Sequence, residues 1–445
     1  MLKWLAGLLV LASSGMARAA PPSSASAPSA PAPSEKPAAE KPAAEKPAAE
    51  KPASEKPASK DEPPPRRYEF LPVPDLGGNS DIGVELGVDF TLARFYDDAR
   101  PYKWLFSGAL STSFKSDAED GLRMVQQYHS FRLDVPNLFG GRVRVDSRVS
   151  FTRNITARYH GLGNASTVDD LPLGDEPSRR NQYIAENVRL RSLVRVKTGT
   201  PFDAAFAAHL RYEFPTVYEG SKLAYDTRNN GIIGTENAVL GGLAVGAILD
   251  TRDNEFVPHQ GVFYQMGVLG MVGSAERIAY GEASAVLSSY IPIGRFMTFA
   301  SRIAGSFQFG RVPFYDLHEG GVFNRQPMLG GERGGRGVPE ARYAGHAKII
   351  ANYELRTTFI PAIHVIGRKL QIGTTTFLDA GRVWNNFDSS ASDGPTPGIK
   401  YGFGGGFFFV WDRSSVFRVE IAHSPSDHDP SEFPLAYYIA NGLTF

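Results

Sequence analysis

From residue 68 to the C-terminus, apolar and polar residues alternate with a period of two. The clearest runs set Val, Leu, Ile or Phe against Gly, Asp, Arg or Ser at every second position, in the segments 82–90, 142–151, 184–197, 297–309 and 417–421. Successive side chains of a strand point to opposite faces, so this pattern predicts strands with one apolar and one polar face. Runs of roughly ten such residues are typical of strands that cross a membrane in a barrel.

The connections between these strands also alternate in length. We expect long loops at 161–181, 215–237, 310–343, 385–399 and 424–434, and short turns at 198–202, 292–295 and 411–415. A soluble β-sandwich would share the alternation of side chains. Long loops at one end and short turns at the other, with arginine recurring on the polar face, favour a membrane barrel with a polar interior over a sandwich.

The first 66 residues have a different character. Residues 1–19 read as a signal peptide, with Lys3 at the start, an apolar core at 4–12 and small residues at the cleavage site 17–19;. Residues 20–66 are rich in Pro, Ala, Glu and Lys, and five pentads of the form EKPAA or EKPAS follow one another. Proline at every fifth residue prevents a helix and nothing apolar is available to bury, so we expect a disordered spacer in the periplasm.

The number of strands follows from the side of the membrane on which the first and the last strand must each have their free end. Fifteen windows fit the alternation, namely 81–92, 102–114, 122–134, 142–153, 183–197, 203–214, 238–250, 261–272, 279–290, 296–309, 344–358, 370–384, 399–410, 415–424 and 435–445. The spacer and the C-terminus are expected on the same side, which requires an even number. Residues 68–76 supply the sixteenth strand, followed by a turn at 77–80.

The meeting point of the first and last strands has a sequence signature of its own. Pro72 and Pro74 have no N–H group, so the first strand pairs poorly along one edge;. We therefore expect the lateral seam, marked by Pro72, Pro74 and the terminal Phe445, to be the weakest ladder of the barrel. The fold prediction is all-β: a 16-stranded antiparallel transmembrane β-barrel over residues 67–445, with an inward-folded extracellular loop.

Composition removes several classes of function. The 47 basic and 47 acidic residues balance, and there is no cysteine. Disulfides and thiolate metal sites are therefore impossible, and nothing draws the chain toward nucleic acid. The nine histidines show no metal-ligand spacing and no catalytic motif is present. We expect no cofactor, no metal and no enzymatic activity.

One stretch, 328–345, combines six glycines with Arg333, Arg336 and Arg342. Glycine at this density lets a backbone fold tightly inside a narrow space. The alternative is an exposed arginine–glycine loop that binds RNA. Such loops need net positive charge and interleaved stacking aromatics, and the neutral chain lacks this combination.

The expected partner of these arginines lies some forty residues further on. Alternation places Phe377 and Asp379 on the inner face of one strand and Glu354 on the inner face of the strand before it. A guanidinium can bind a carboxylate with two parallel hydrogen bonds. We predict that Arg336 pairs with Asp379, with Glu354 as second choice, and that Gly337, Phe377 and Gly381 complete this loop–lumen lock. The alternative is a loop that only plugs and stiffens the barrel.

Five stretches carry a resemblance to a known family. Asp250, Arg252, Asp253, Pro258 and Gly261 resemble a D-x-R-D…P-x-x-G turn, 329–337 an inward loop with its Arg-Gly pair, and 353–356 the strand after that loop; 377–381 matches F-x-D-x-G, and 159–164 reads YHGLGN. Together they resemble the bacterial surface antigen superfamily of outer-membrane barrels, which includes the BamA/TamA family and two-partner secretion transporters. The resemblance covers about 68–445.

The resemblance implies a role at the bacterial outer membrane in the insertion or translocation of proteins or lipids. Expected partners are membrane lipid, client outer-membrane proteins or lipids and a periplasmic subunit, with the barrel itself a monomer. Two departures stand out. Val338 replaces an aromatic, which predicts a less firmly packed loop tip, and the periplasmic POTRA domains of the family are absent. The second hypothesis is a passive channel or structural barrel gated by its inward loop.

Overall fold

The computed structural model describes residues 68–96, 99–117, 121–167, 179–365, 368–385, 392–411, 415–425 and 435–445. The predicted signal peptide, 1–19, and spacer, 20–66, lie outside these residues. Among the described residues, no helix is both long enough and apolar enough to cross a membrane.

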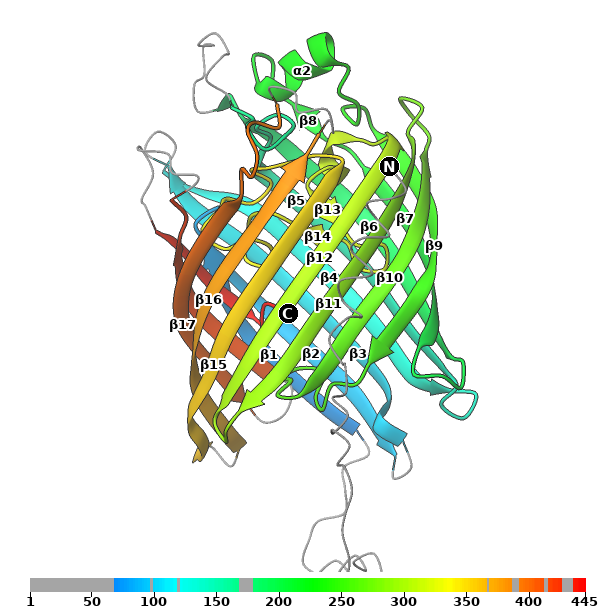
Figure 1. Cartoon of the computed structure of the whole chain (residues 1–445), viewed down its shortest axis with the longest axis vertical. Helices are drawn as coiled ribbons and strands as arrows, with labels where there is room; N and C mark the ends of the chain where they lie inside the picture. The colour runs from blue at the N-terminus through cyan, green and yellow to red at the C-terminus, as the bar shows by residue number, and fades with distance from the viewer. Residues whose placement is uncertain are drawn as a thin grey trace, which may run out of the picture. The chain divides into compact units, whose positions relative to one another are not determined.

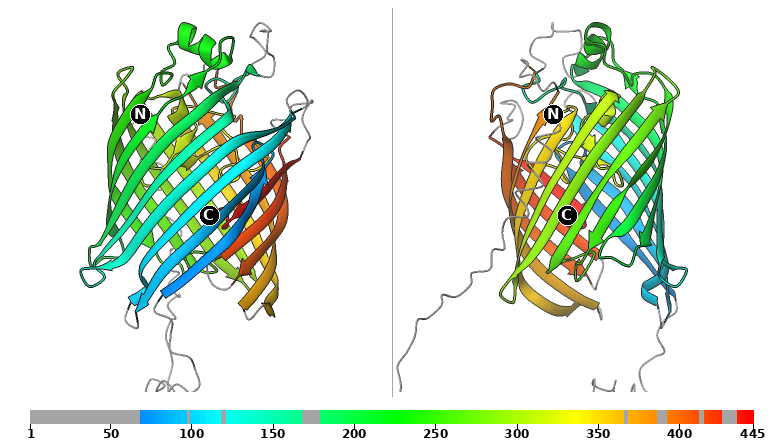
Figure 2. Two further views of the ribbon diagram at one scale, coloured as in Figure 1. Left: turned by 180° about the vertical axis from the view of Figure 1, so that it is seen from behind. Right: turned by 45° about the vertical axis from the view of Figure 1, so that its right-hand side comes forward.

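Sixteen long strands form a closed antiparallel wall in which each strand pairs with the next and the last meets the first (Figures 1 and 2). The predicted fold class is therefore confirmed. The wall strands are β1 (Tyr68–Asn79), β2 (Gly83–Tyr96), β3 (Ala99–Asp117), β4 (Gly121–Leu138), β5 (Val143–Arg158), β6 (Gln182–Lys197), β7 (Asp203–Glu213), β9 (Ala238–Asp250), β10 (Gly261–Gly273), β11 (Ala279–Ile293), β12 (Met297–Arg311), β15 (Ala347–Val365), β16 (Arg368–Trp384), β17 (Lys400–Trp411), β18 (Ser415–His423) and β19 (Ala436–Asn441).

The loops at one end contain the small elements. They are β8 (Thr216–Val217), which adds two residues beside β6, α2 (Lys222–Asn230), η2 (Phe314–Asp316), β13 (Glu319–Gly320) and β14 (Gln326–Pro327). The helix α2 was not predicted. Ser221 caps its start by accepting the N–H of Ala224, and Gly231 ends it with φ 66°;.

The two faces of the wall have opposite chemistry. Large apolar side chains such as Leu243 (72% exposed), Val268 and Leu378 point outward. Charged and amide side chains point inward, and Asn352 and Asp379 are completely buried there. This distribution is the reverse of a soluble protein and matches a wall that faces lipid outside and polar groups inside.

Several predicted strand ends are wrong, and two of them lie at the seam. β1 continues to Asn79, whose Oδ1 accepts the N–H groups of Asp81 and Ile82, so the turn begins only at residue 80. The last strand ends at Asn441 and not at Phe445. Gly442 has φ 83°, which turns the chain out of the wall;.

The seam between β1 and β19 is the shortest ladder of the wall. Its register consists of two pairs, Gly78 opposite Ile439 and Asn79 opposite Tyr438, whereas the neighbouring β18–β19 ladder has six. The first strand, blue in Figure 2, lies beside the red C-terminal strands there. Below these pairs, Asn441 holds the strands through its side chain, donating from Nδ2 to Asp75 and Asp89.

The assignment of faces gives a first prediction. Leu243→Arg places a charge on the lipid face of β9 and should lower the free energy of unfolding by about 2–4 kcal/mol. Urea unfolding in lipid bilayers, followed by tryptophan fluorescence, measures the change. Ser150→Arg, on the inner face of β5, is the matched control and should cost less. Equal losses for the two variants would contradict the assignment.

Candidate functional site

The long loop between β12 and β15, residues 312–346, folds into the lumen, where the views draw it in yellow inside the ring of strands (Figures 1 and 2). Its first half is anchored on β6 and β7. Asp316 accepts a 2.6 Å hydrogen bond from Arg211, and Glu319 accepts one of 2.8 Å from Arg189. Arg325 of the same loop pairs with Glu282 on β11. These ion pairs hold the loop on one side of the barrel.

The second half of the loop inserts Arg336 into the opposite wall. The side chain of Arg336 is fully buried, at 0% exposure. Its Nε lies 2.8 Å from Asp379 Oδ2 and its Nη2 3.1 Å from Oδ1, the geometry of a two-bond fork;. The backbone N–H of Arg336 also donates to Asp379, at 3.0 Å. The guanidinium carbon lies 3.5 Å from the centre of the Phe377 ring;.

The remaining nitrogen of Arg336 faces three further acceptors. Nη1 lies 2.8 Å from Glu354 Oε1 on β15, 3.1 Å from Glu420 Oε1 on β18 and 3.0 Å from Thr444 Oγ1 of the C-terminal tail. One loop cation is thus shared by carboxylates on three wall strands and by the last residues of the chain.

The charges of this cluster determine its protonation. Burial disfavours the charged form of Arg336, but the carboxylates of Asp379, Glu354 and Glu420 more than offset it and hold its pKa well above the ordinary value;. The guanidinium is therefore permanently charged. Loss of this cation would leave three buried carboxylates with one neutralising group fewer, which is costly in a low-dielectric site.

Glycines make room for the loop on the wall. A Cβ at Gly402 of β17 would lie 2.0 Å from the carbonyl oxygen of Arg336, and one at Gly404 would lie 2.7 Å from the Phe377 ring. Gly337 has φ 90°, its N–H donates to Tyr438 Oη at 2.9 Å, and a Cβ there would meet the backbone of His423. Gly381 similarly leaves space for the side chain of Leu329.

The tip of the loop is firmly packed. Val338 is buried in a cluster with Met328, Leu329, Tyr343 and Ile350. The expectation of a loosely packed tip is therefore wrong, because these neighbours leave Val338 only 1% exposed.

The C-terminal tail, residues 442–445, lies in the lumen beside the lock. Arg356 donates to the carbonyl oxygen of Phe445 at 3.0 Å, and the Phe445 ring packs against Tyr290. Phe445 therefore lies inside the barrel and outside the seam ladder in which the sequence placed it. Pro72 and Pro74 do lie on β1, in the part of the strand below its two pairs with β19.

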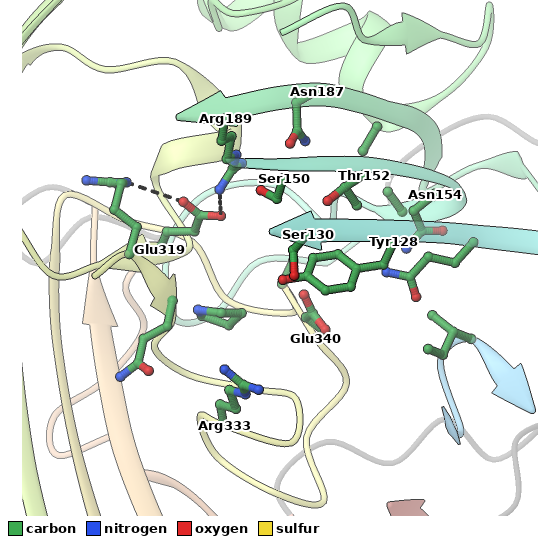
Figure 3. A pocket seen from close by; sticks show the side chains of 18 of the residues that line it. Tyr128, Ser130, Ser150, Thr152, Asn154, Asn187, Arg189, Glu319, Arg333 and Glu340 are labelled. Atoms are coloured by element: carbon green, nitrogen blue, oxygen red, sulfur yellow. Dashed lines mark hydrogen bonds and ion pairs between the residues drawn. The ribbon is translucent and has the colours of Figure 1, made fainter. Parts of the chain in front are cut away.

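The other side of the lumen holds a cavity of about 640 Å³, lined by the loop and by β1–β7 and β19 (Figure 3). Within the described part of the chain, Asn187 Oδ1 and Arg148 Nε, both from residues that line it, have no hydrogen-bond partner. Figure 3 labels Tyr128, Ser130, Ser150, Thr152, Asn154, Asn187, Arg189, Glu319, Arg333 and Glu340. A cavity with these polar groups on its walls suits water and polar solutes.

Sequence reasoning brought Arg336, Asp379, Glu354 and Phe377 together, and the structure places them in contact. It missed Glu420, although the alternation in β18 had already put that residue on the polar face. It also missed Tyr438, which the alternation in β19 likewise puts on the inner face. It missed Thr444 because a tail that turns inward leaves no signal in a period of two. Over the described ranges, no group of three or more His, Asp or Glu is arranged to hold a metal ion.

Removing the guanidinium gives the next prediction. Arg336→Ala should lower the free energy of unfolding by about 3–5 kcal/mol, because it leaves buried carboxylates without their cation. Unfolding in lipid bilayers measures the loss, and limited proteolysis reports release of the loop. Arg333→Ala is the matched control, because Arg333 is 53% exposed and should be nearly neutral when replaced. An unchanged stability in Arg336→Ala would contradict the lock.

A third prediction concerns Gly402 of β17, on which the loop backbone rests. Gly402→Ala inserts a methyl group where the carbonyl of Arg336 rests, and overpacking of this kind costs about 1–3 kcal/mol. Gly270→Ala in β10 is the control, because a Cβ there meets nothing within 4 Å. The two variants are compared by bilayer unfolding and by protease sensitivity of residues 328–345. Equal behaviour would show that the loop does not rest on β17.

Comparison with solved structures agrees with this fold. The chain is similar to BamA from Haemophilus ducreyi lacking POTRA domains 1–3, with a TM-score of 0.51 and 13% identity over 84% of this chain and 70% of that one. It is also similar to CdiB from Escherichia coli, with a TM-score of 0.51 and 13% identity over 86% of this chain and 64% of that one. At this identity the likeness concerns the fold.

No curated protein is similar enough in sequence to match the chain. The description of a family does match it: the Omp85 superfamily domain covers residues 103–418, well over half of the chain. This match covers most of the barrel and includes the inward loop with Arg336 and its wall partner Asp379. The chain belongs to the Omp85 superfamily.

Proposed function

We propose that this barrel acts in the insertion or translocation of proteins or lipids at the outer membrane, by way of the seam between β1 and β19. In this proposal the short-turn end faces the periplasm, where a separate subunit supplies receptor domains for the client. The barrel works as a monomer, without a catalytic step, and its partners are client polypeptides or lipids and the surrounding membrane.

The incomplete seam carries this proposal. Two residue pairs join β1 to β19, and they lie at the loop end of β1. Below them, the edge of β1 from residue 68 to 77 has no ladder partner on that side among the described strands. Unpaired N–H and C=O groups on a strand edge are a template for another strand. Pro72 and Pro74 interrupt that template and limit how tightly any strand can pair there.

The position of the C-terminal tail, which the lock binds inside the lumen, supports the same proposal. Residues 442–445 would extend β19 along β1 if they stayed in the wall. They are instead bound inside the lumen, where Thr444 accepts hydrogen bonds from Arg336 and Arg418 and Phe445 accepts one from Arg356. The lock thus withdraws from the seam the residues that could close it, and release of the tail would allow β19 to lengthen.

A second candidate function is a passive channel or structural barrel gated by the inward loop. The observation that favours it is the cavity of about 640 Å³ beside the loop. Under this alternative the lock sets the width of a pore and no client is handled. A steady conductance in planar bilayers that becomes larger in Arg336→Ala would support this alternative.

Crosslinking the seam tests the first proposal. Asp75→Cys with Asn441→Cys replaces two side chains that now share a 2.8 Å hydrogen bond across the seam. The chain has no other cysteine, so a crosslink forms only there. Locking the seam should abolish function, seen as accumulation of unassembled outer-membrane proteins or lipids in a strain that depends on this chain, and reduction should restore it.

The control pair is Val88→Cys with Leu110→Cys, which are register partners on β2 and β3 away from the seam. Its crosslink should leave function intact. Full function with a locked seam would exclude lateral opening as the mechanism.

A further inference from the structure

The connection between β9 and β10, residues 251–260, has a fixed shape of its own. Asp253 Oδ1 accepts the N–H groups of His259 and Gln260, and Asn254 Oδ1 accepts those of Phe256 and Val257. Two backbone hydrogen bonds, from Thr251 to Val262 and from Asp253 to Gln260, close the hairpin beneath it. Asp and Asn side chains that bond to nearby N–H groups in this way rigidify a turn.

One side of this turn contacts the first residues of β5, at the short-turn end of the barrel. Glu255 accepts hydrogen bonds of 2.8 and 3.1 Å from the two terminal nitrogens of Arg144. Arg144 in turn donates to Asp134 on β4 at 2.7 and 3.0 Å. Two strands, β6 and β7, separate β5 from β9 in the wall, so Glu255 reaches this partner from the mouth of the barrel and not from a neighbouring strand.

The other side of the turn contacts the opposite wall. Val257 is 8% exposed and packs in a cluster with Phe408 and Val410 of β17 and Val416 of β18. Leu443 of the C-terminal tail packs against the same cluster. His259 contacts Thr298 on β12, at 3.2 Å. Four strands, β11, β12, β15 and β16, lie between β10 and β17, so a turn that touches both β5 and β17 must cross the lumen.

We propose that the turn 251–260 is the floor of the lumen: it closes the short-turn mouth to ions and polar solutes, and the mouth opens when Val257 leaves the wall. The ion pair with Arg144 holds one side of the floor, and the apolar contact of Val257 seals the other. The cavity beside the inward loop is then a chamber closed below by this turn. This inference stands whether or not the seam opens.

The floor and the lock share the tail. Leu443 rests against the floor, and the next residue, Thr444, accepts from Arg336. Withdrawal of the tail from the lumen therefore removes an apolar neighbour of Val257 and loosens the floor. Removal of Arg336 alone leaves the Arg144–Glu255 pair and the packing of Val257 on β17 in place, so the mouth stays closed.

Current through the full-length protein in planar bilayers bathed in potassium chloride tests this proposal. The wild type should be closed for most of the recording. Glu255→Gln should raise the fraction of time open by about two- to fivefold, the range expected for loss of a partly exposed ion pair. Val257→Asp should raise it by about tenfold or more, because a charge cannot stay in the apolar cluster. Arg295→Gln, in the short turn after β11, is the matched control and should behave as wild type.

A crosslink guards against variants that only disturb folding. Val257→Cys with Val416→Cys, joined by a short bis-maleimide, should hold the mouth closed and suppress the openings that Glu255→Gln produces. Folding of every variant is checked by gel electrophoresis in detergent. A folded barrel resists denaturation in the unheated sample and unfolds in the heated one.

Three outcomes would overturn the proposal. The first is that the turn variants and the control carry the same current as wild type. The second is a steady wild-type conductance that the crosslink does not reduce. The third is that Arg336→Ala opens a lasting pore while the turn variants do not, which would make the inward loop the barrier.

Discussion

A single buried cation organises the interior of this barrel. Arg336 reaches from a loop into a wall made of three strands, and each strand supplies one carboxylate, from Asp379, Glu354 and Glu420. A desolvated cluster of this kind adds little net stability compared with well-packed apolar residues, but breaking it is expensive. Its contribution is therefore geometric: the loop has one position in which Arg336 meets all three of these carboxylates.

The same interaction links parts of the chain that are distant in sequence. The C-terminal tail enters the cluster through Thr444, and its preceding residue touches the turn between β9 and β10. The tail cannot satisfy the lock and extend the β19 ladder at the same time. The short seam is thus a consequence of where the last four residues are bound. A loop, a tail and a turn that meet in the lumen allow a change at one end of the barrel to affect the other.

Much of this fold could be predicted from the sequence because a lipid-facing wall imposes a strict period of two. That period located fifteen of the sixteen wall strands and put Asp379 and Glu354 on the inner face. The first strand was placed because the spacer and the C-terminus had to lie on the same side, which required an even number. It could not show which inner carboxylates would share Arg336, because Glu420 comes from a strand that is distant in sequence. It failed at the tail, where Leu443 and Phe445 keep the wall pattern but Gly442 turns the chain inward. The helix α2 was missed because loops at the barrel rim are not subject to the period.

The most direct test of the central interaction is a double-mutant cycle between Arg336→Met and Asp379→Asn, measured as free energies of unfolding in lipid bilayers. Both substitutions remove the charge while keeping the side chain close to its original size. If the two side chains form the pair described, their combined effect should be smaller than the sum of the single effects by about 0.5–3 kcal/mol, the coupling seen between residues in contact. Additive effects would contradict the pairing and, with it, the lock on which this account rests.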